Sequence, residues 1–311
     1  MADESYGKEL PEEVNKLAKE DLREDDLLKK QSLDRMREWL AKSSEIKFCR
    51  DDAPFLLRFL RSRKYSIPQA QEMLERYLAI RQLYGEWFQQ LDPVDPKMSA
   101  LIDSGYCFPL IEKDEFGRRV IFTAVGNFKA TEFTAADMVR YHAMVIESLL
   151  DEEESQVTGY TQIYDENGLS MAHLAIWSLT DIRNIIRCIQ NSLPMRHKSS
   201  HFLSLPSSAN TIFEFFTSLL NEKLKKRIMI HKSVEDLHQH IKKEILPKEY
   251  GGTVSISDMT KKFRQDLMEK RQKLIDLDKL EIDLSKKEKL VQDFHDDMAG
   301  IAGSFRQLQV D

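Results

Sequence analysis

The chain has 311 residues, with 46 Lys and Arg against 52 Asp and Glu, which gives a formal net charge of −6. Taken alone, this sum disfavours nucleic acid and anionic membranes as partners, because a uniformly acidic surface repels both. Apolar residues make up 41% of the chain, enough for a core, and the 11 Gly and 9 Pro favour long helices over turn-rich all-β architectures.

The cysteines and the N-terminal residues indicate in which cellular compartment the protein is located. Cys49, Cys107 and Cys188 are few and far apart, which favours a reducing compartment over a disulfide framework. The first residues are acidic and not apolar, so no signal peptide is expected. The richest apolar stretch, residues 212–220, is far shorter than the roughly 20 residues that a membrane-spanning helix needs. We therefore expect a cytoplasmic protein, monomeric and without a nucleic-acid partner.

The first part of the chain has a helical pattern. Residues 11–43 are charged, with apolar residues recurring mostly every three to five positions. Asp51 or Asp52 can cap a second helix that has Pro54 in its first turn. A third helix restarts near Pro68 and continues to about Phe88. The proline-containing linker of residues 91–96 ends this part, because each proline disfavours helix at the preceding residue. We predict a helical domain over residues 11–92.

Strand and helix signals alternate after this linker. Strands are predicted at residues 106–111, 119–125, 159–165, 201–206 and 227–231. Helices are predicted at residues 134–150, 172–192, 213–226 and 234–241. This alternation predicts an α/β domain over residues 97–256 with parallel crossovers. Residues 257–311 are charged and helix-prone without a clean heptad, and we treat them as a helical tail.

Common catalytic and metal-binding signatures are missing from the sequence. It contains no GxxxxGK[ST], GxGxxG, GxSxG or CxxC segment. His197 and His201 are four residues apart, but they flank a strand and do not share a helix face. We expect no metal, no cofactor and no catalysis. An enzyme stays a third-ranked alternative, because the α/β pattern alone permits one.

Two segments differ in composition from the chain as a whole. Residues 185–232 contain eight basic and two acidic residues, a balance of +6 that is either a solvated face or an anion-binding surface. Residues 206–220 are apolar around much of a helix circumference. Such a helix is either buried in the core or has two apolar faces, one over a cavity and one toward a membrane.

Three stretches in the same order carry a resemblance to a known family. They are residues 55–65 (FLLRFLRSRKY), residues 192–228, which begin SLPMR, and residues 246–252 (LPKEYGG). Over about residues 50–255 the chain resembles the CRAL-TRIO lipid-binding family, which includes tocopherol and retinaldehyde carriers and the clavesins. The resemblance implies a mixed, mainly parallel sheet covered by helices, after a small all-helical N-terminal domain and before the helical tail.

The resemblance also implies a function. It is that of an intracellular carrier, peripherally associated with membranes, which holds one retinoid, tocopherol-like molecule or phospholipid in an enclosed pocket under a mobile gate helix. The pocket residues implied in this way are Tyr106, Thr123, Val139, His142, Ala143, Ile146, Tyr160, Tyr164, Ile185, Cys188, Ile189, Leu193, Ile212, Phe215 and Phe216. For each of them, plain core packing is the alternative.

The resemblance places a phosphoinositide-binding cleft on the basic stretch. The implied residues there are Arg196, Lys198, Lys223 and Arg227, while Arg58 either joins the cleft or forms a structural ion pair. The rival function is a phosphoinositide-binding trafficking adaptor that recruits a partner through residues 257–311.

Overall fold

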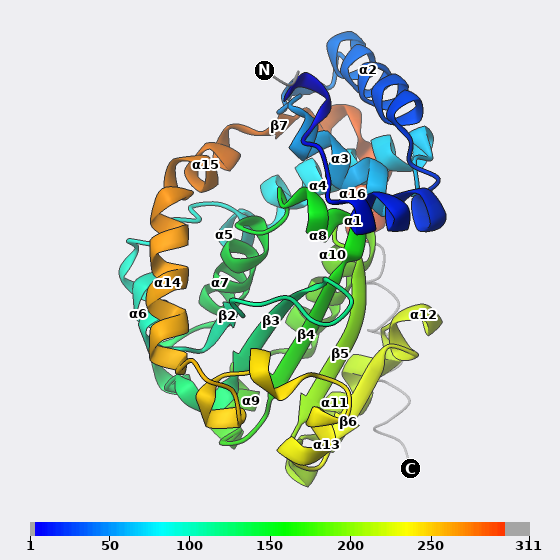
Figure 1. The fold of residues 1–311 in the computed structure, drawn as a ribbon. Helices are drawn as coiled ribbons and strands as arrows, with labels where there is room; N and C mark the ends of the chain where they lie inside the picture. Colours follow the sequence, from blue (N-terminus) through cyan, green and yellow to red (C-terminus); the bar gives the residue numbers. More distant parts are fainter. Residues whose placement is uncertain (1–3, 296–311) are drawn as a thin grey trace.

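The computed structural model describes residues 4–295 and centres on one mixed sheet with the strand order β2-β3-β4-β5-β6 (Figure 1). Strands β2 (Cys107–Pro109) and β3 (Arg119–Ala124) pair antiparallel. The remaining neighbours pair in parallel. These strands are β4 (Tyr160–Asp165), β5 (His197–Leu203) and β6 (Ile228–His231). The α/β alternation predicted from the sequence is therefore confirmed.

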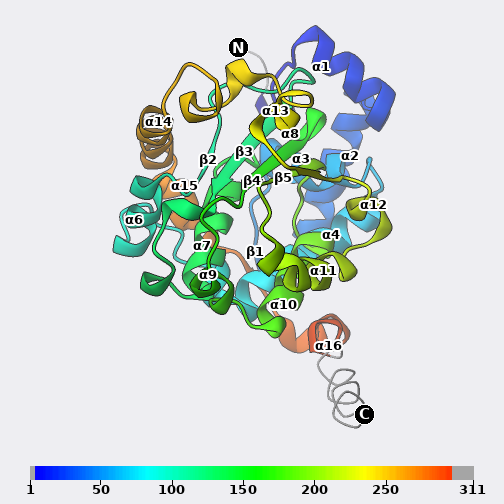
Figure 2. The same cartoon turned by 90° about the horizontal axis from the view of Figure 1, so that it is seen from below.

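Helices cover both faces of this sheet. One face carries α7 (Ala135–Glu147), α9 (Met171–Ala175), α10 (Leu179–Asn191) and α11 (Asn210–Ser218) (Figure 2). The opposite face carries α13 (Val234–His238) and the segment that follows it. On that face Tyr250 meets the ring of Phe122 at 4.8 Å. The two faces are therefore covered by different parts of the chain.

The front part of the chain is a helical layer. Its helices are α1 (Glu12–Leu17), α2 (Asp26–Lys42), α3 (Ala53–Ser62), α4 (Ile67–Leu83), α5 (Gly85–Phe88) and α6 (Pro96–Ser104), with a π-helical turn at Ala18–Leu22. Asp52 caps α3 by accepting a hydrogen bond from the Phe55 amide. The strand β1 (Ile46–Phe48) is an exception to the predicted all-helical character of this part.

The tail returns to the front part of the molecule. Helices α14 (Ile256–Glu269) and α15 (Arg271–Asp276) run along one side of the molecule, and β7 (Glu281–Ile282) and α16 (Glu288–His295) follow them in the chain (Figure 1). Strand β7 pairs antiparallel with β1. Phe263, Leu267 and Leu274 are buried in the main core. Up to α16 the tail is therefore part of the fold, while residues 296–311 of the predicted tail lie outside the described residues.

Two predicted helices are each divided in the structure. The helix predicted for residues 172–192 is divided into α9 and α10, because Ser178 and Asp181 form a capping box that starts α10. The helix predicted for residues 213–226 is divided into α11 and α12 (Glu222–Lys225), because Asn221 caps α12 by accepting from the Leu224 amide. Within residues 4–295, no helix has the length and apolar character needed to cross a membrane.

Candidate functional site

An apolar row crosses the sheet on the face toward α10 and α11. The strand register aligns Thr123 with Tyr164, Tyr164 with Phe202, and Phe202 with Ile230. The ring of Phe202 stacks on Tyr164 at 4.9 Å and meets Phe213 of α11 edge-on, also at 4.9 Å. Because alternate residues of a strand share a face, this row defines one continuous surface, which we call the apolar face.

Helix α11 lies against the apolar face without being buried in it. None of its residues is buried, although Ile212, Phe213, Phe215 and Phe216 are apolar and partly covered. Nearby, Ile189 of α10 is 43% exposed and Ile230 of β6 is 55% exposed. A core helix would bury such side chains completely. The structure therefore excludes the core-helix interpretation and favours a helix with two apolar surfaces.

The predicted pocket residues divide into two groups by their packing. Several are part of the main core or pack against it, as the packing alternative requires: Tyr106, Ala143, Ile146, Tyr160 and Leu193. A second group, on β4, α7, α10 and α11, belongs to neither packed core: Val139, Tyr164, Ile185, Ile189, Ile212, Phe215 and Phe216. Only the second group supports a ligand space between the sheet and its covering helices.

Cys188 does not join this second group. It is buried in a small separate core with Ala79, Ile80 and Phe294, between α4, α10 and α16. Its assignment as a ligand contact is corrected for that reason. Four other side chains were not assigned to the pocket from the sequence. Phe202 and Phe213 border the apolar face, and Ile182 and Ile186 are buried outside both packed cores. Phe213 stood in the apolar run of residues 206–220, whereas the place of Phe202 depends on strand register.

A neutral polar pair lies among the predicted pocket residues. The Tyr106 hydroxyl and His142 Nε2 are 2.9 Å apart. Burial lowers the pKa of His142 to about 4, so its imidazole is neutral at physiological pH. Nearby, the Thr123 hydroxyl donates to Cys107 Sγ at 3.3 Å. Both Tyr106 and His142 therefore have a partner within the protein.

Two of the predicted basic residues, Arg196 and Lys198, pair with one carboxylate together with Lys64. Arg196 and Lys198 are at the start of β5, and Lys64 follows α3. The Asp21 carboxylate lies 3.4 Å from both Lys64 Nζ and Lys198 Nζ, and it forms an ion pair with Arg196. We call Lys64, Arg118, Arg196, Lys198, Lys223 and Arg227 the basic cluster.

The pKa values show that the basic cluster shares one electrostatic environment. Burial alone would raise the pKa of Asp21, but Arg196, Lys198 and Lys64 together lower it to about 2. Burial lowers the pKa of Lys223, and the positive charges of Arg227, Lys64 and Arg196 lower it further. A cluster with this excess of positive charge is suited to an anion that brings more charge than one carboxylate does.

Two members of the basic cluster were missed in the sequence. Arg118 comes from the β2–β3 turn and contributes to the lowered pKa of Arg227, and Lys64 comes from the end of the helical signature of residues 55–65. Neither lies in the basic stretch of residues 185–232. Arg118 and Lys64 come close to this basic stretch only in the folded chain.

Gly159 permits the tight start of strands β4 and β5. Its φ of +95° is in the region that favours glycine, and a Cβ there would lie 2.6 Å from the Arg196 carbonyl oxygen. This carbonyl accepts the Tyr160 amide at 3.0 Å. The backbone that carries Arg196 and Lys198 is thus held close to β4.

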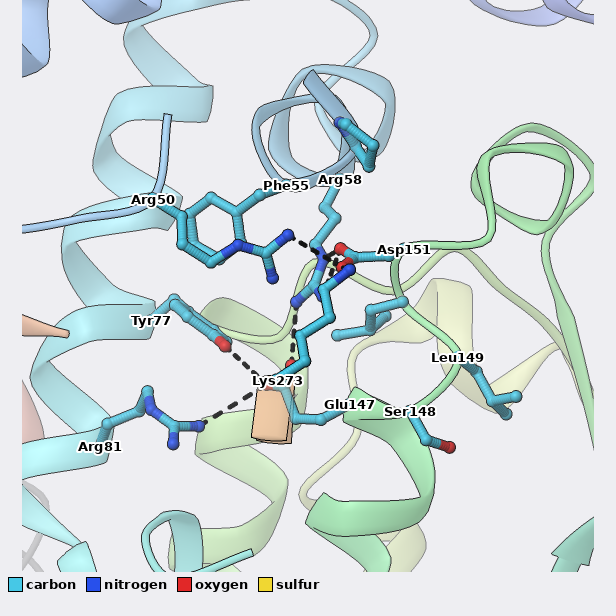
Figure 3. A network of polar contacts seen from close by, with 12 residues as sticks. Arg50, Phe55, Arg58, Tyr77, Arg81, Glu147, Ser148, Leu149, Asp151 and Lys273 are labelled. Atoms are coloured by element: carbon cyan, nitrogen blue, oxygen red, sulfur yellow. Dashed lines mark hydrogen bonds and ion pairs between the residues drawn. The ribbon is translucent and has the colours of Figure 1, made fainter. Parts of the chain in front are cut away.

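Arg58 does not belong to the basic cluster. Its side chain is 1% exposed, its Nη1 lies 2.9 Å from the Glu147 carboxylate, and its Nε donates to Asp151 at 2.6 Å (Figure 3). Glu147 also accepts a hydrogen bond from the Tyr77 hydroxyl at 2.7 Å. Burial opposes the charged form, but Asp151 and Glu147 raise the pKa of Arg58. The phosphoinositide role of Arg58 is therefore wrong, and the structural ion pair is correct.

Three parts of the chain meet at Asp151. Arg50 and Arg58 come from the front part, Asp151 from the segment after α7, and Lys273 from α15 (Figure 3). A cavity of about 220 Å³ lies beside them. Arg50, Arg58 and Lys273 all pair with Asp151, so this junction is a structural tie between the parts of the molecule.

The described residues offer little for metal chemistry. His201 Nδ1 and His231 Nε2 are 2.9 Å apart under the segment that follows β6. Within residues 4–295, however, no group of three or more His, Cys, Asp or Glu side chains is placed to hold a metal ion.

Comparison with known proteins agrees with this architecture. Residues 103–252 match the CRAL/TRIO domain, and residues 25–98 match the Pinta-like UBA domain. Clavesin-1 of Xenopus laevis is 29% identical over 230 residues, which cover 74% of this chain and 69% of that protein. Clavesin-2 of Homo sapiens is also 29% identical over 230 residues, covering 74% of this chain and 70% of that protein.

The crystal structure of Sfh5 aligns with 13% identity and a TM-score of 0.49, over 85% of this chain and 99% of that chain. The sequence matches, the mixed sheet with α10 and α11 over one face, and the three sequence stretches agree with one another. The chain contains a CRAL/TRIO domain, at residues 103–252.

Proposed function

We propose that the protein is a non-enzymatic carrier that holds one hydrophobic ligand between the apolar face of the sheet and helices α10 and α11. The observation that carries this proposal is the set of aromatic and aliphatic side chains on α11 that stay partly exposed against Phe202. A ligand that buries ~400 Å² of apolar surface there would contribute about 10 kcal/mol before association costs, at ~25 cal/mol per Å². That suffices to hold an insoluble molecule in water.

Helix α11 acts as the gate in this proposal. Polar contacts with α10 occur just after the end of α11, where the Gln190 side chain donates to the Leu219 carbonyl at 3.1 Å and accepts from the Asn221 amide at 2.8 Å. Its partly exposed apolar side chains suit insertion into a membrane interface when it moves from the sheet. Helix α12, which carries Lys223 of the basic cluster, follows α11 after residues 219–221. One approach to an anionic membrane would therefore engage both gate and cluster.

The basic cluster is proposed to bind phosphoinositide headgroups. Its cations come from separate elements, and three of them, Lys64, Arg196 and Lys198, pair with one carboxylate, which is an arrangement suited to phosphate oxygens. In this view the protein is cytoplasmic, monomeric and visits membranes peripherally. The formal charge of −6 is then an average over an acidic surface and this local basic surface.

The carrier function is tested by the natively bound molecule. We expect native mass spectrometry of the purified full chain to show a protein–ligand complex with one apolar small molecule or lipid. We also expect the protein to move that molecule between donor and acceptor vesicles. A ligand-free protein that transfers no retinoid, tocopherol or phospholipid would overturn the proposal.

Charge reversal in the basic cluster should weaken membrane docking. We expect Arg196→Glu with Arg227→Glu to reduce binding to vesicles containing phosphatidylinositol bisphosphate by at least about 30-fold, because each lost cation near the surface is worth about 1 kcal/mol. The salt dependence of binding should flatten as well. Binding of the apolar ligand should survive, since the cluster is not part of the apolar face.

The matched control changes the net charge equally elsewhere. Lys129 and Lys261 have exposed side chains on other parts of the surface. Lys129→Glu with Lys261→Glu should leave sedimentation with these vesicles within about twofold of the wild type. Equal losses in both double variants would show that overall charge, and not the basic cluster, determines docking.

Asp21 should act as an internal competitor of the headgroup. Its carboxylate already pairs with Lys64, Arg196 and Lys198. We expect Asp21→Asn to strengthen binding to phosphoinositide vesicles by about three- to tenfold, or ~1 kcal/mol, in vesicle titrations. Since the pKa of Asp21 is about 2, the competing carboxylate stays ionised and this gain should be the same at pH 5.5 and pH 8. Weaker binding by Asp21→Asn would show that the carboxylate organises the cluster instead.

A further inference from the structure

The Glu166 side chain points toward the apolar face. The preceding residue, Asp165, accepts a hydrogen bond from the Tyr250 hydroxyl at 2.5 Å, and Tyr250 packs on Phe122 on the opposite side of the sheet. The Glu166 amide donates to the Leu203 carbonyl at 2.9 Å, so the parallel strand ladder continues through this residue. Because successive side chains of a strand alternate, Glu166 faces the same side as Tyr164.

The carboxyl group of Glu166 has no partner there. Among residues 4–295, no hydrogen bond or ion pair reaches it. Its polar neighbours are already engaged, because the Tyr164 hydroxyl donates to Gln162 Oε1 at 2.6 Å and the Tyr106 hydroxyl pairs with His142. Glu166 is half-buried, and a carboxyl that is shielded in part from water and has no partner costs free energy unless a ligand group satisfies it.

The protonation of this group narrows the choice of ligand. Burial, with a smaller contribution from the negative charge of Asp165, raises the pKa of Glu166 to about 7. Both the acid and the carboxylate are then populated near neutral pH. A carbonyl can pair only with the acid, and an ammonium forms an ion pair only with the carboxylate, whereas a neutral hydroxyl can accept from the acid and donate to the carboxylate. A ligand carboxylate would be repelled by the ionised form.

We propose that Glu166 is a specificity-determining residue which selects a lipid with a hydroxyl at its buried end and rejects the matching carboxylic acid. This inference rests on the proposed carrier function and deepens it. It gives the ligand space a polar group without a protein partner, at the carboxyl end of β4. The class it names is that of neutral lipid alcohols, which includes long-chain alcohols, retinol-type alcohols and phenols.

The experiment compares matched alcohol and acid probes. The ligand-stripped full chain is incubated at pH 8 with equimolar 1-octadecanol and octadecanoic acid, and separately with retinol and retinoic acid, and the bound species are quantified by mass. In at least one pair we expect the wild type to bind the alcohol at least about tenfold better than the acid. Glu166→Gln keeps a hydrogen-bonding group without the charge, so it should lower this ratio to about twofold or less by admitting the acid.

Two further variants make the result specific. Glu166→Leu should bind the alcohol more weakly than Glu166→Gln does, because it offers no hydrogen bond. Glu86→Gln changes an exposed carboxyl on α5 and should keep the wild-type ratio. Equal binding of alcohol and acid by the wild type, or an unchanged ratio in Glu166→Gln, would overturn the inference while carriage itself stands. If no probe of either pair binds the wild type, this inference is overturned, whereas the carrier function is decided separately by native mass spectrometry and vesicle transfer.

Discussion

Arg58→Met should lower the free energy of unfolding by about 3–5 kcal/mol, the largest effect that we expect from a single substitution in this chain. The substitution leaves the buried Glu147 carboxylate, and with it Asp151, without the cation that pairs with both (Figure 3). Arg81 Nη1 is 3.7 Å from Glu147 and too far to replace the lost hydrogen bonds. Urea denaturation at neutral pH measures the loss.

The control for Arg58 is an exposed cation in an ion pair. The Lys129 side chain is 80% exposed and lies 3.4 Å from Glu132, so Lys129→Met should change the unfolding free energy by less than about 1 kcal/mol. Folded Arg58→Met should bind phosphoinositide vesicles as the wild type does. A stable Arg58→Met protein that has lost vesicle binding would return Arg58 to the headgroup site.

Leu267→Ala in the tail should cost about 2–5 kcal/mol of unfolding free energy. Leu267 is fully buried in the main core from α14, although it belongs to a part of the sequence with a charged, tail-like composition. Removing its side chain leaves a cavity against the core, which neighbouring groups fill only in part. Chemical denaturation compared with the wild type gives the value.

The adjacent residue provides a matched control for this effect. Met268 is on the same helix and 44% exposed, so Met268→Ala should change the unfolding free energy by less than about 1 kcal/mol. Equal, small effects of both substitutions would show that α14 is an appendage. In that case the adaptor alternative, in which the tail is free to recruit a partner, would gain support.

The packed tail also changes how that alternative must be tested. Deleting residues 258–311 would remove Phe263, Leu274 and the strand that pairs with β1, together with Leu267. We expect such a deletion to unfold the protein, so loss of a partner would not identify an adaptor. Exposed substitutions on α14 and α15 are the better probe, because they leave the core intact.

Local signals in the sequence predicted a large part of the fold. The alternation of strand and helix signals after residue 105 gave the α/β class, and Asp52 caps α3 as one of the two proposed residues. The breaks at Ser178 and Asn221 were missed, yet both carry capping residues that sequence reasoning can detect. These features were accessible because they depend on residues three or four positions apart.

Contacts between distant segments were beyond the reach of such patterns. The sequence left Arg58 undecided, because its partners Glu147 and Asp151 come from the other part of the chain. Cys188 was assigned to the pocket, although its side of α10 faces α4 and α16. Both residues were predicted in helices and lie in helices, and only the packing of α3 and α10 decides which neighbour each side chain faces.

The sequence by itself therefore determined the α/β class, the apolar character of α11 and the local excess of basic residues, since each depends on composition and short-range periodicity. The tertiary structure decided which charges meet, the joining of the tail to β1, and the side of the sheet that Glu166 faces. Side chains far apart in the sequence have no shared periodicity. Their meeting is set by strand register and core packing, which only the folded chain has.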